Sequence, residues 1–489
     1  MEKLIKGRAI APTRTKPKHL PRMHRRFAEL DKGKRKKPQK IQKGSGQRHA
    51  EQSPATSTAP AGTGPNDGDH RIIFQTYTPN STPANGGPIP PDPSGATGAS
   101  NVVLYTGNSY LMASINGGGS FTEHDTTKFL PAAQGRPVDQ VMIYVPHRRL
   151  FAWMMQHQVT PATGDGNFRL AVANLDDVLT DVETAWTVYD FTSTDVGQAG
   201  SPTDRQDLSY SESRLYMTTT VDKGRVVMSL SLEDLVQKRK VSWIRTKPLP
   251  AIKRPPPLKD DDIFHFSDLS QQNSQNVHSV AIADSNTLRV MTLNDSTGTY
   301  DFHDVDVGDF PEVDNLSSLD PDKIDWLTRG VPNVSASVVR GDNLWVAWDA
   351  AASTAGDQPF YPNAHVRLAR IDLRNWTTIE ERQVWNPDYA FAYGCLAIGP
   401  DGDIGYGVGV GGSKDYPNSC FGILGDYVVY FRDDSTATAG ADSEPRWGDY
   451  ITVRPSTVDS RRFAAFGYFT KKSGGGADQQ PFYLSYGRP

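Results

Sequence analysis

The chain of 489 residues lacks several features that define large classes of protein. Its two cysteines are too few for a disulfide-rich scaffold or for the usual structural zinc clusters. No apolar run approaches the roughly 18 residues of a membrane-spanning helix, so no membrane span is expected. Helices long enough to cover a parallel sheet are not indicated either, which argues against an α/β fold.

Positive charge is concentrated near the start of the chain. Residues 1–50 carry 17 Lys and Arg against three acidic residues, although the whole chain has a formal charge of only −4. Up to residue 68 the sequence has almost no apolar periodicity and is rich in Pro, Ser, Thr and Gly. Such a stretch cannot bury enough apolar surface to offset its ordering entropy. We therefore predict a disordered basic arm over 1–68 and a folded domain over 69–489.

The basic arm has two interpretations. It is either an electrostatic tether to an anionic partner, or a solubilising or targeting tail with no specific partner. A second basic stretch begins at Lys238–Lys240, but aromatic residues do not interleave with it as they do in proteins that bind single-stranded nucleic acid. The arm also lacks the apolar core of a signal peptide, so the chain itself does not indicate its location.

From residue 70 onward, short β-type runs recur in sets of four. The runs are rich in Val, Tyr, Phe, Trp and Thr and are separated by Gly, Pro, Asn and Asp, the pattern of strands and turns. First strands of the sets begin near 141, 208, 278, 334, 394 and 450, and a shorter set covers 102–125. This period is typical of a β-propeller, whereas a pair of β-sandwiches is the alternative. We predict an all-β propeller of six or seven four-stranded blades, closed by pairing of a strand near 71–78 with the C-terminal blade.

One predicted turn has a recognisable sequence, SINGGGSF at 114–121. It resembles the Asp-box (BNR) turn of sialidase-type propellers, Ser/Thr-x-Asp-x-Gly-x-x-Trp/Phe. Ser114, Gly118 and Phe121 match this pattern, and Asn116 stands where the aspartate would be. A short polar side chain closes such a turn and glycine supplies a positive φ. In that family the turn joins the third and fourth strands of a blade and is structural.

Three further runs, DQVMIYVPHRRLFAWMMQ, WNPDYAFAY and RWGDYITVRPS, look like a group of large bacterial sialidase-like propellers. Most members of that group have no assigned activity. The resemblance covers about residues 100–489 and implies an extracellular or cell-surface location. It leaves the basic arm unexplained.

Propeller geometry nominates candidate site residues, because the residues just before each innermost strand converge on one mouth of the central funnel. In chain order they are Asp139, Gln140, Asp207, Tyr210, His278, Asn333, Ser335, Tyr389, Tyr393, Arg446, Trp447, Asp449 and Tyr450. Carboxylates accept hydroxyl hydrogens and aromatic faces stack on sugar C–H surfaces, so this set suits a polar, ring-shaped ligand. The alternative is that these groups tie neighbouring blades together or bind channel water.

Two classes of function are open, and the sequence does not decide whether the protein is an enzyme. The first is a monomeric binding module that presents the funnel to a glycan or protein ligand. The second is a sialidase-like glycoside hydrolase, with Tyr450 or Tyr393 as nucleophile. Its acid would be one of Asp139, Asp207 and Asp449.

Sialidase activity proper is disfavoured by the sequence. The early Phe-Arg-Ile/Leu-Pro motif of sialidases is missing, and only Arg446, with Arg205 or Arg454, lies near the start of a blade. The feature that would separate the two classes is a pair of carboxylates at hydrolytic spacing in the funnel.

No cofactor and no metal are expected. The histidines show no metal-binding spacing with cysteine. Asp401-Gly402-Asp403 and Asp260-Asp261-Asp262 are the turns that would suit Ca²⁺, but neither has the twelve-residue EF-hand pattern, so plain β-turns are favoured.

Overall fold

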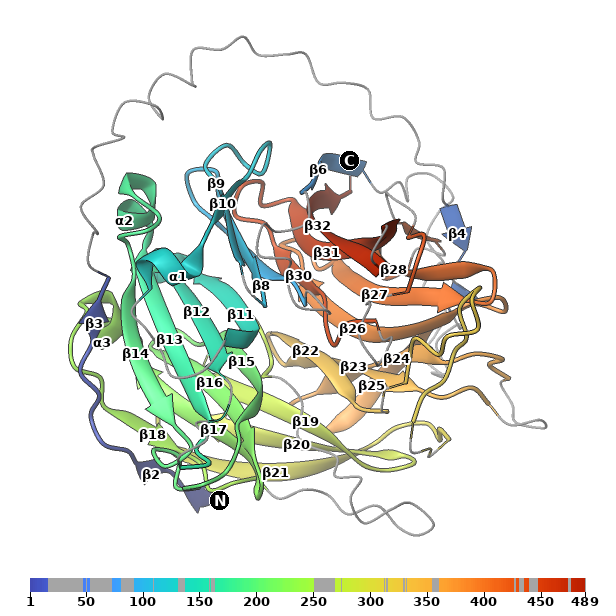
Figure 1. Cartoon of the computed structure of the whole chain (residues 1–489). Helices are drawn as coiled ribbons and strands as arrows, with labels where there is room; N and C mark the ends of the chain where they lie inside the picture. Colours follow the sequence, from blue (N-terminus) through green and yellow to red (C-terminus); the bar gives the residue numbers. More distant parts are fainter. Residues whose placement is uncertain are drawn as a thin grey trace.

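The computed structural model describes residues 1–15, 47–49, 51–52, 73–80, 92–108, 110–130, 137–157, 159, 163–249, 269–273, 275–311, 313, 315–328, 330, 332–353, 360–425, 428–430, 435–438, 447–473 and 476–488. These residues form seven antiparallel sheets that radiate as blades from a central axis (Figure 1). The chain is thus a seven-bladed β-propeller. The predicted fold class is confirmed, and the blade count is seven rather than six.

Each blade runs from an innermost strand at the axis to an outer strand at the rim. The first blade contains β7 (Ser94–Gly98), β8 (Val102–Gly107), β9 (Tyr110–Ser114) and β10 (Thr122–His124). The second contains β11 (Pro137–Val145), β12 (Leu150–His157), β13 (Asn167–Asn174) and β14 (Thr187–Thr192). The third contains β15 (Asp204–Tyr210), β16 (Arg214–Val221), β17 (Gly224–Ser231) and β18 (Trp243–Arg245). The fourth and fifth contain β19 (Asn276–Asp284), β20 (Thr287–Asn294) and β21 (Thr299–Asp306); and β22 (Val334–Arg340), β23 (Asn343–Ala350), β24 (His365–Asp372) and β25 (Thr377–Trp385). The last two contain β26 (Ala390–Ile398), β27 (Ile404–Gly412), β28 (Asp415–Ile423) and β29 (Val428–Tyr430); and β30 (Thr452–Pro455), β31 (Arg462–Ser473) and β32 (Gly476–Gly487).

Helices in the described part of the chain are short. They are α1 (Thr126–Phe129), α2 (Leu175–Thr180), α3 (Leu232–Val236) and a 3-10 turn at Pro146–Arg148. Among these residues no helix has the length and apolarity needed to cross a membrane.

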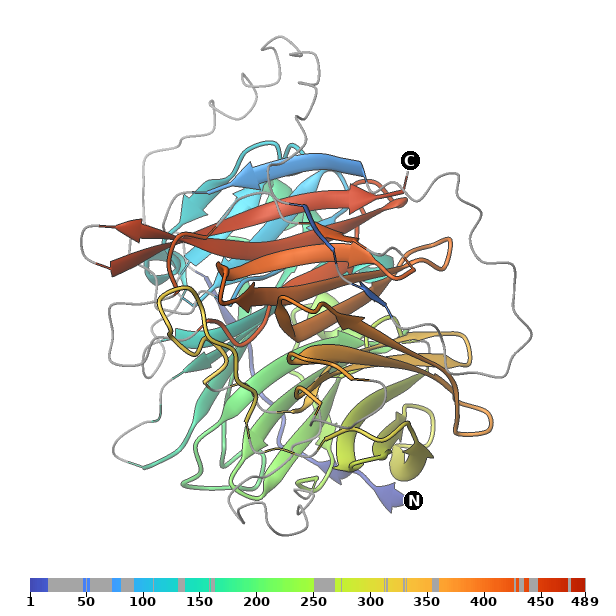
Figure 2. The same cartoon turned by 90° about the vertical axis from the view of Figure 1, so that its right-hand side faces the viewer.

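The ring is closed by a strand that precedes the first blade. β6 (Ile73–Pro79) pairs antiparallel with β32 and becomes the outermost strand of the seventh blade. Figure 2 shows β6 beside this blade, next to the strands of the first blade. The expected closure by a strand near 71–78 is confirmed. Because the seventh blade contains strands from before and after the other six, the ring cannot open without breaking the β6–β32 ladder.

Apolar side chains fill the interfaces between the blades. β8 and β12 are buried along almost their whole length and read as near-continuous apolar runs. Trp153 of β12 packs edge-on against Trp186, with ring centroids 5.1 Å apart, and belongs to a buried cluster that joins the first two blades. Since both faces of a blade are covered by its neighbours, each sheet is stabilised from two sides.

The first 15 residues, here called the N-terminal strap, differ from the predicted disordered arm. They contain β1 (Glu2–Lys3), β2 (Ile5–Lys6) and β3 (Thr13–Arg14), which pair with β21, β18 and β14. β1 thereby supplies the fourth strand of blade four, and β2 and β3 add a fifth strand to blades three and two (Figure 1). β4 (Gln47–His49) and β5 (Glu51–Gln52) cover the outer edges of blades six and five in the same way.

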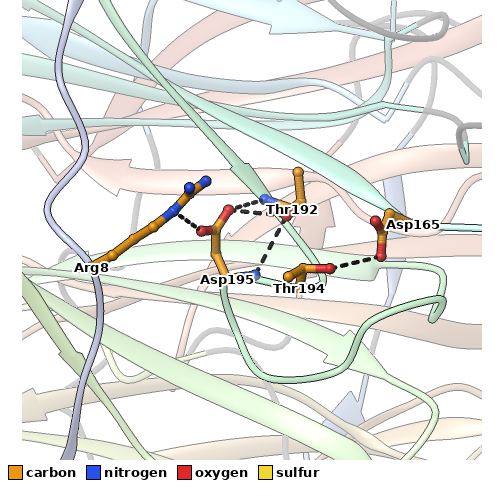
Figure 3. Close-up of polar contacts among 5 residues, drawn as sticks. All are labelled: Arg8, Asp165, Thr192, Thr194 and Asp195. Carbon is orange, nitrogen blue, oxygen red and sulfur yellow. Dashed lines mark hydrogen bonds and ion pairs between the residues drawn. The ribbon is translucent and has the colours of Figure 1, made fainter. Parts of the chain in front are cut away.

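Side chains hold the N-terminal strap in place as well as backbone pairing. Ile10 is buried in the cluster that contains Trp243, and Gly7 lies so close to Trp243 that a Cβ would come within 2.2 Å of its ring. Arg8 Nε donates to the buried carboxylate of Asp195 at 2.5 Å, and Asp195 also accepts the N–H of Thr192 (Figure 3). Disorder was wrongly predicted for this part because an edge strand relies on backbone hydrogen bonds, which residues of any charge can make. The densest basic run, at 32–40, lies outside the described residues.

Candidate functional site

A cavity of about 560 Å³ lies on the axis, where the innermost strands meet. Its charged and larger polar wall residues are Asn108, Asp139, Gln156, Asp204, Arg205, Gln206, Asp207, Arg225, Gln271, Asn333, Asp349, Tyr393, Asp449, Tyr450 and Arg454. A volume of this order is typical of sites for small ligands. With carboxylates, guanidinium groups, amides and phenols in one wall, this axial cavity can both donate and accept hydrogen bonds.

Some of the residues that the sequence placed just before the innermost strands lie in the wall of this cavity, and others do not. Those that line the axial cavity are Asp139, Asp207, Asn333, Ser335, Tyr393, Asp449 and Tyr450, together with Arg205 and Arg454. They come from five different blades and converge because the innermost strands all begin at the same end of the axis.

Four of the innermost strands are bulged at this end. Against its partner strand, each register shifts by one residue: between Pro137 and Gln140, between Asp204 and Asp207, between Val334 and Ala336, and between Ala392 and Cys395. The residues inside these shifts include Asp139, Arg205, Ser335 and Tyr393, all of which line the cavity. A bulge turns the side chain of its extra residue away from the regular alternation. The bulges therefore explain how strands packed on both faces still present side chains to the axis.

Gln140 and Trp447 lie in the packed interior beside the cavity. Gln140 follows the bulge of β11, and its Oε1 accepts hydrogen bonds from Thr106 Oγ1 at 2.7 Å and Trp153 Nε1 at 2.9 Å. Trp447 is fully buried and stacks on Tyr468 at 4.8 Å. Both side chains tie elements of the ring together.

Blade four is set back from the axial cavity. The segment around Leu269 and Gln271 lines the wall in front of β19, with the N–H of Leu269 donating to the Asp207 carboxylate at 2.8 Å. His278 of β19 is consequently buried, with its Nδ1 2.9 Å from Thr292 Oγ1. Burial, and then the charge of His303, lower the pKa of His278 to about 4, so its imidazole is neutral at physiological pH.

Three further candidates have other placements. Tyr210 is half-buried with its ring centroid 5.9 Å from that of His147. Tyr389 is half-buried beside Gly412. Arg446 lies outside the described residues.

Carboxylates gather at one side of the cavity. Oxygens of Asp92, Asp139 and Asp449 all lie within 4.8 Å of one another, and the N–H of Asp449 donates to Asp92 at 2.8 Å. Asp92 precedes β7, which the sequence interpretation missed because it began the first blade near 102. Among the described residues, these three carboxylates are grouped closely enough for their oxygens to bind one divalent cation.

Tyr450 is held as a neutral phenol. Its hydroxyl donates to the carbonyl oxygen of Gln140 at 3.1 Å and accepts the N–H of the same residue. Burial, followed by the nearby Asp139 and Asp92, raises the pKa of Tyr450 well above its usual value. This environment opposes formation of the phenolate that a nucleophile would need.

Asp349 is a wall residue that the sequence interpretation missed. It lies near the end of β23, in the run NLWVAWDA, whereas the candidates were taken from the first strand of each blade. Its Oδ2 accepts the N–H of Tyr393 at 2.9 Å, and the backbone of Gly394 lies beside the carboxyl group. Burial raises the pKa of Asp349 to about 7, against the opposing effect of the backbone N–H groups of Tyr393 and Gly394. An aspartate that ends an otherwise apolar run was the available signal.

The turn at 114–121 joins β9 and β10, the third and fourth strands of the first blade. Ser114 Oγ accepts the N–H of Gly118 at 3.0 Å, and Asn116 Oδ1 accepts the N–H of Ser120 at 3.1 Å. Gly118 has a φ of +86°, and the ring of Phe121 packs edge-on against Tyr105. The asparagine thus makes the turn-closing contact that a short acceptor side chain is suited to make.

No family profile matches the chain, and no curated protein sequence matches it. Among solved structures it is similar to a GH93 α-L-arabinofuranosidase of Fusarium graminearum in complex with arabinobiose, with 10% identity, 85% of this chain and 98% of that chain covered, and a TM-score of 0.40. It is also similar to an α-L-arabinanase of Penicillium chrysogenum complexed with arabinobiose, with 10% identity, 84% and 98% coverage and a TM-score of 0.34. A variant of the NanB sialidase of Streptococcus pneumoniae has 10% identity, 68% and 67% coverage and a TM-score of 0.38. At these values the likeness carries no argument about activity, and the function has to be inferred from the cavity itself.

Proposed function

We propose that the protein binds a glycan in the axial cavity. The observation that carries this proposal is the wall itself, which combines carboxylates, amides, arginines and Tyr393 around about 560 Å³. Sugar hydroxyls both donate and accept hydrogen bonds, and a sugar ring has an apolar C–H face that an aromatic side chain can cover. The volume suits one or two sugar rings rather than a folded protein partner.

A second candidate is glycoside hydrolysis, and one contact favours it. The carboxylates of Asp139 and Asp449 lie within 4.8 Å of each other on the cavity wall. Retaining glycosidases hold two carboxyl groups about 5 Å apart, whereas inverting enzymes need roughly 6.5–9.5 Å. If the protein cleaves a glycoside through this pair, we expect retention at the anomeric carbon.

The test is incubation of the full chain with a panel of natural oligosaccharides and of methyl glycosides of neutral pentoses and hexoses. Retained ligands and cleaved products are both read by mass spectrometry. Retention without cleavage supports the binding function, and cleavage supports the hydrolase. If no glycan is retained and none is cleaved, both functions are contradicted, and a protein partner becomes the next candidate.

Asp449→Asn assigns either result to the cavity. This substitution should reduce retention or cleavage, because Asp449 lies in the wall. Asp306→Asn is the matched control, since Asp306 is an exposed carboxylate on the outer strand β21. Equal effects of the two substitutions would show that the glycan binds somewhere other than the cavity.

A further inference from the structure

The bulge of β26, like that of β15 at Arg205, holds a non-glycine residue of the cavity wall in a left-handed backbone conformation. Its first residue, Tyr393, has a φ of +59°, in the left-handed region that a bulky side chain rarely adopts. Such a conformation costs on the order of 1–3 kcal/mol and persists only where neighbouring groups enforce it. Tyr393 lines the cavity, so the strain lies where a ligand would bind.

The enforcing group comes from the neighbouring blade. Asp349 of β23 reaches the bulge from blade five, and its Oδ2 accepts the N–H of Tyr393 at 2.9 Å, with the backbone of Gly394 beside the carboxyl group. The Asp349 backbone is itself fixed, because its N–H donates to the carbonyl oxygen of Asn333 at 3.0 Å. The bulge has little room against the same blade, since a Cβ on Gly394 would lie 3.0 Å from Ser335 Oγ and 3.0 Å from Val366 Cγ1.

The ring of Tyr393 has an aromatic support behind it. Its centroid lies 5.4 Å from that of Trp447, which is fully buried and stacks in turn on Tyr468. Tyr393 is the half-buried member of this series and the one that belongs to the cavity wall. A rigid aromatic ring with a packed rear face is suited to cover the C–H face of a sugar ring at low entropic cost.

We propose that Asp349 is the positioning residue of the axial cavity, clamping the bulge of β26 so that Tyr393 serves as the stacking platform for a pyranose or furanose ring. This inference rests on the proposed glycan-binding function and adds the contact surface and its control. Asp349 acts through the backbone N–H of Tyr393. Its replacement should therefore move the platform without removing it.

The clamp also responds to protonation. A carboxylate accepts hydrogen bonds more strongly than a neutral acid, and burial raises the pKa of Asp349 to about 7. The titratable groups on the stretches of β26 and β24 beside it are Tyr393 and Cys395, and His365 and Arg367. Val366, the cross-strand partner of Asp349, lies between the last two, which consequently point to the other face of the sheet. We expect the clamp to tighten as the pH rises from 6 to 8.

The platform position is measured first without a ligand. The full chain is labelled with 3-fluorotyrosine, and the ¹⁹F resonance of Tyr393 is assigned by its loss in Tyr393→Phe. Asp349→Leu, which has no acceptor, should shift this resonance, whereas Asp349→Asn, which keeps one acceptor oxygen, should shift it less. Gly394→Ala adds a Cβ that would meet Ser335 and Val366 at 3.0 Å, so it displaces the bulge with Asp349 intact and provides a second route if Asp349→Leu does not fold. Asp207→Asn is the matched control, because Asp207 is also a buried wall carboxylate bonded to a backbone N–H, but on β15.

Affinity is then measured for the neutral methyl glycosides at pH 6 and pH 8. Asp349→Leu should weaken binding about tenfold, which corresponds to about 1.4 kcal/mol. Asp349→Asn should weaken it about threefold or less, because it keeps one acceptor oxygen. The wild type should bind more tightly at pH 8 than at pH 6, and Asp349→Asn should show no such change.

Each contrary result has a distinct meaning. An unmoved Tyr393 resonance in both Asp349→Leu and Gly394→Ala overturns the clamp, whatever binds. A moved resonance with unchanged glycoside affinity overturns the platform and leaves the glycan-binding function standing. If the wild type binds no glycoside, the proposed function fails and the platform fails with it. The ¹⁹F resonance of Tyr393 still shows whether Asp349 positions the bulge.

Discussion

The axis and the rim of the ring are built in opposite ways. At the axis, Tyr393 has a left-handed backbone, Asp349 is a buried carboxyl group, and three carboxylates lie within 4.8 Å of one another. At the rim, β1, β2, β3 and β6 add regular backbone pairing to the outer strands. The wall where a ligand would bind thus combines a left-handed bulge with buried carboxyl groups, while the outer edge supplies backbone pairing. We expect substitutions at the axis to alter binding and pH response, and substitutions at the rim to alter stability alone.

The largest expected effect is the pH dependence that Asp349 gives to stability. Its pKa in the folded protein is raised to about 7 from the ordinary aspartate value of 3.8, so the folded state holds the proton more tightly than the unfolded state. This stabilisation is complete below about pH 4 and is lost as the pH rises through 7. Asp349→Asn has no such loss. The difference in unfolding free energy between the two proteins should therefore change by roughly 4 kcal/mol from pH 4 to pH 8, in favour of the variant.

Urea denaturation at several pH values measures this change. Because the wild type and Asp349→Asn share every other titrating group, their difference isolates position 349. A difference that stays constant from pH 4 to pH 8 would show that Asp349 titrates normally in the folded protein.

The next largest effect lies at the rim, in the turn between β9 and β10. Gly118 has a φ of +86°, and a Cβ there would lie 2.2 Å from the ring of Tyr483. Gly118→Ala should destabilise the protein by roughly 3 kcal/mol, from the left-handed backbone and the overpacking together. Thermal unfolding measures the loss, and glycoside affinity well below the transition should be unchanged. A weakened affinity would contradict the separation of rim and axis.

The sequence predicted this turn and the ring because both depend on local patterns. Short apolar strands, turn residues and the SINGGGSF motif are readable without knowledge of what each strand contacts. The site was predicted less completely, since it depends on contacts between blades. The bulge at Tyr393 exists only relative to β27, Asp349 acts from a second strand, and His278 is hidden by a segment that passes in front of β19. The N-terminal strap was missed because its edge pairing has no side-chain signature.

Substitution of Gln140 tests whether this residue near the axis contacts the ligand or only stabilises the fold. Gln140→Leu removes the acceptor for Trp153 Nε1 and Thr106 Oγ1, and the buried indole N–H loses its partner. The expected loss of stability is roughly 2 kcal/mol. Binding should be affected less than in Asp449→Asn, which changes a wall residue. The reverse order of effects on glycoside affinity would return Gln140 to the ligand-contacting set.

The smallest effect concerns the N-terminal strap. Arg8 is 73% exposed and its ion pair with Asp195 is open to solvent on one side, so Arg8→Ala should cost less than about 1 kcal/mol. Ile10 is buried against the same blade edge, and Ile10→Ala should cost more, up to the free energy with which the strap is docked. Hydrogen exchange of the strap amides measures the docking directly, with faster exchange in Ile10→Ala than in Arg8→Ala. Added salt should reduce the difference between wild type and Arg8→Ala, because it screens the exposed pair. If Arg8→Ala releases the strap completely while Ile10→Ala does not, charge rather than burial holds this part of the rim, and the contrast with the axis would be smaller than we infer.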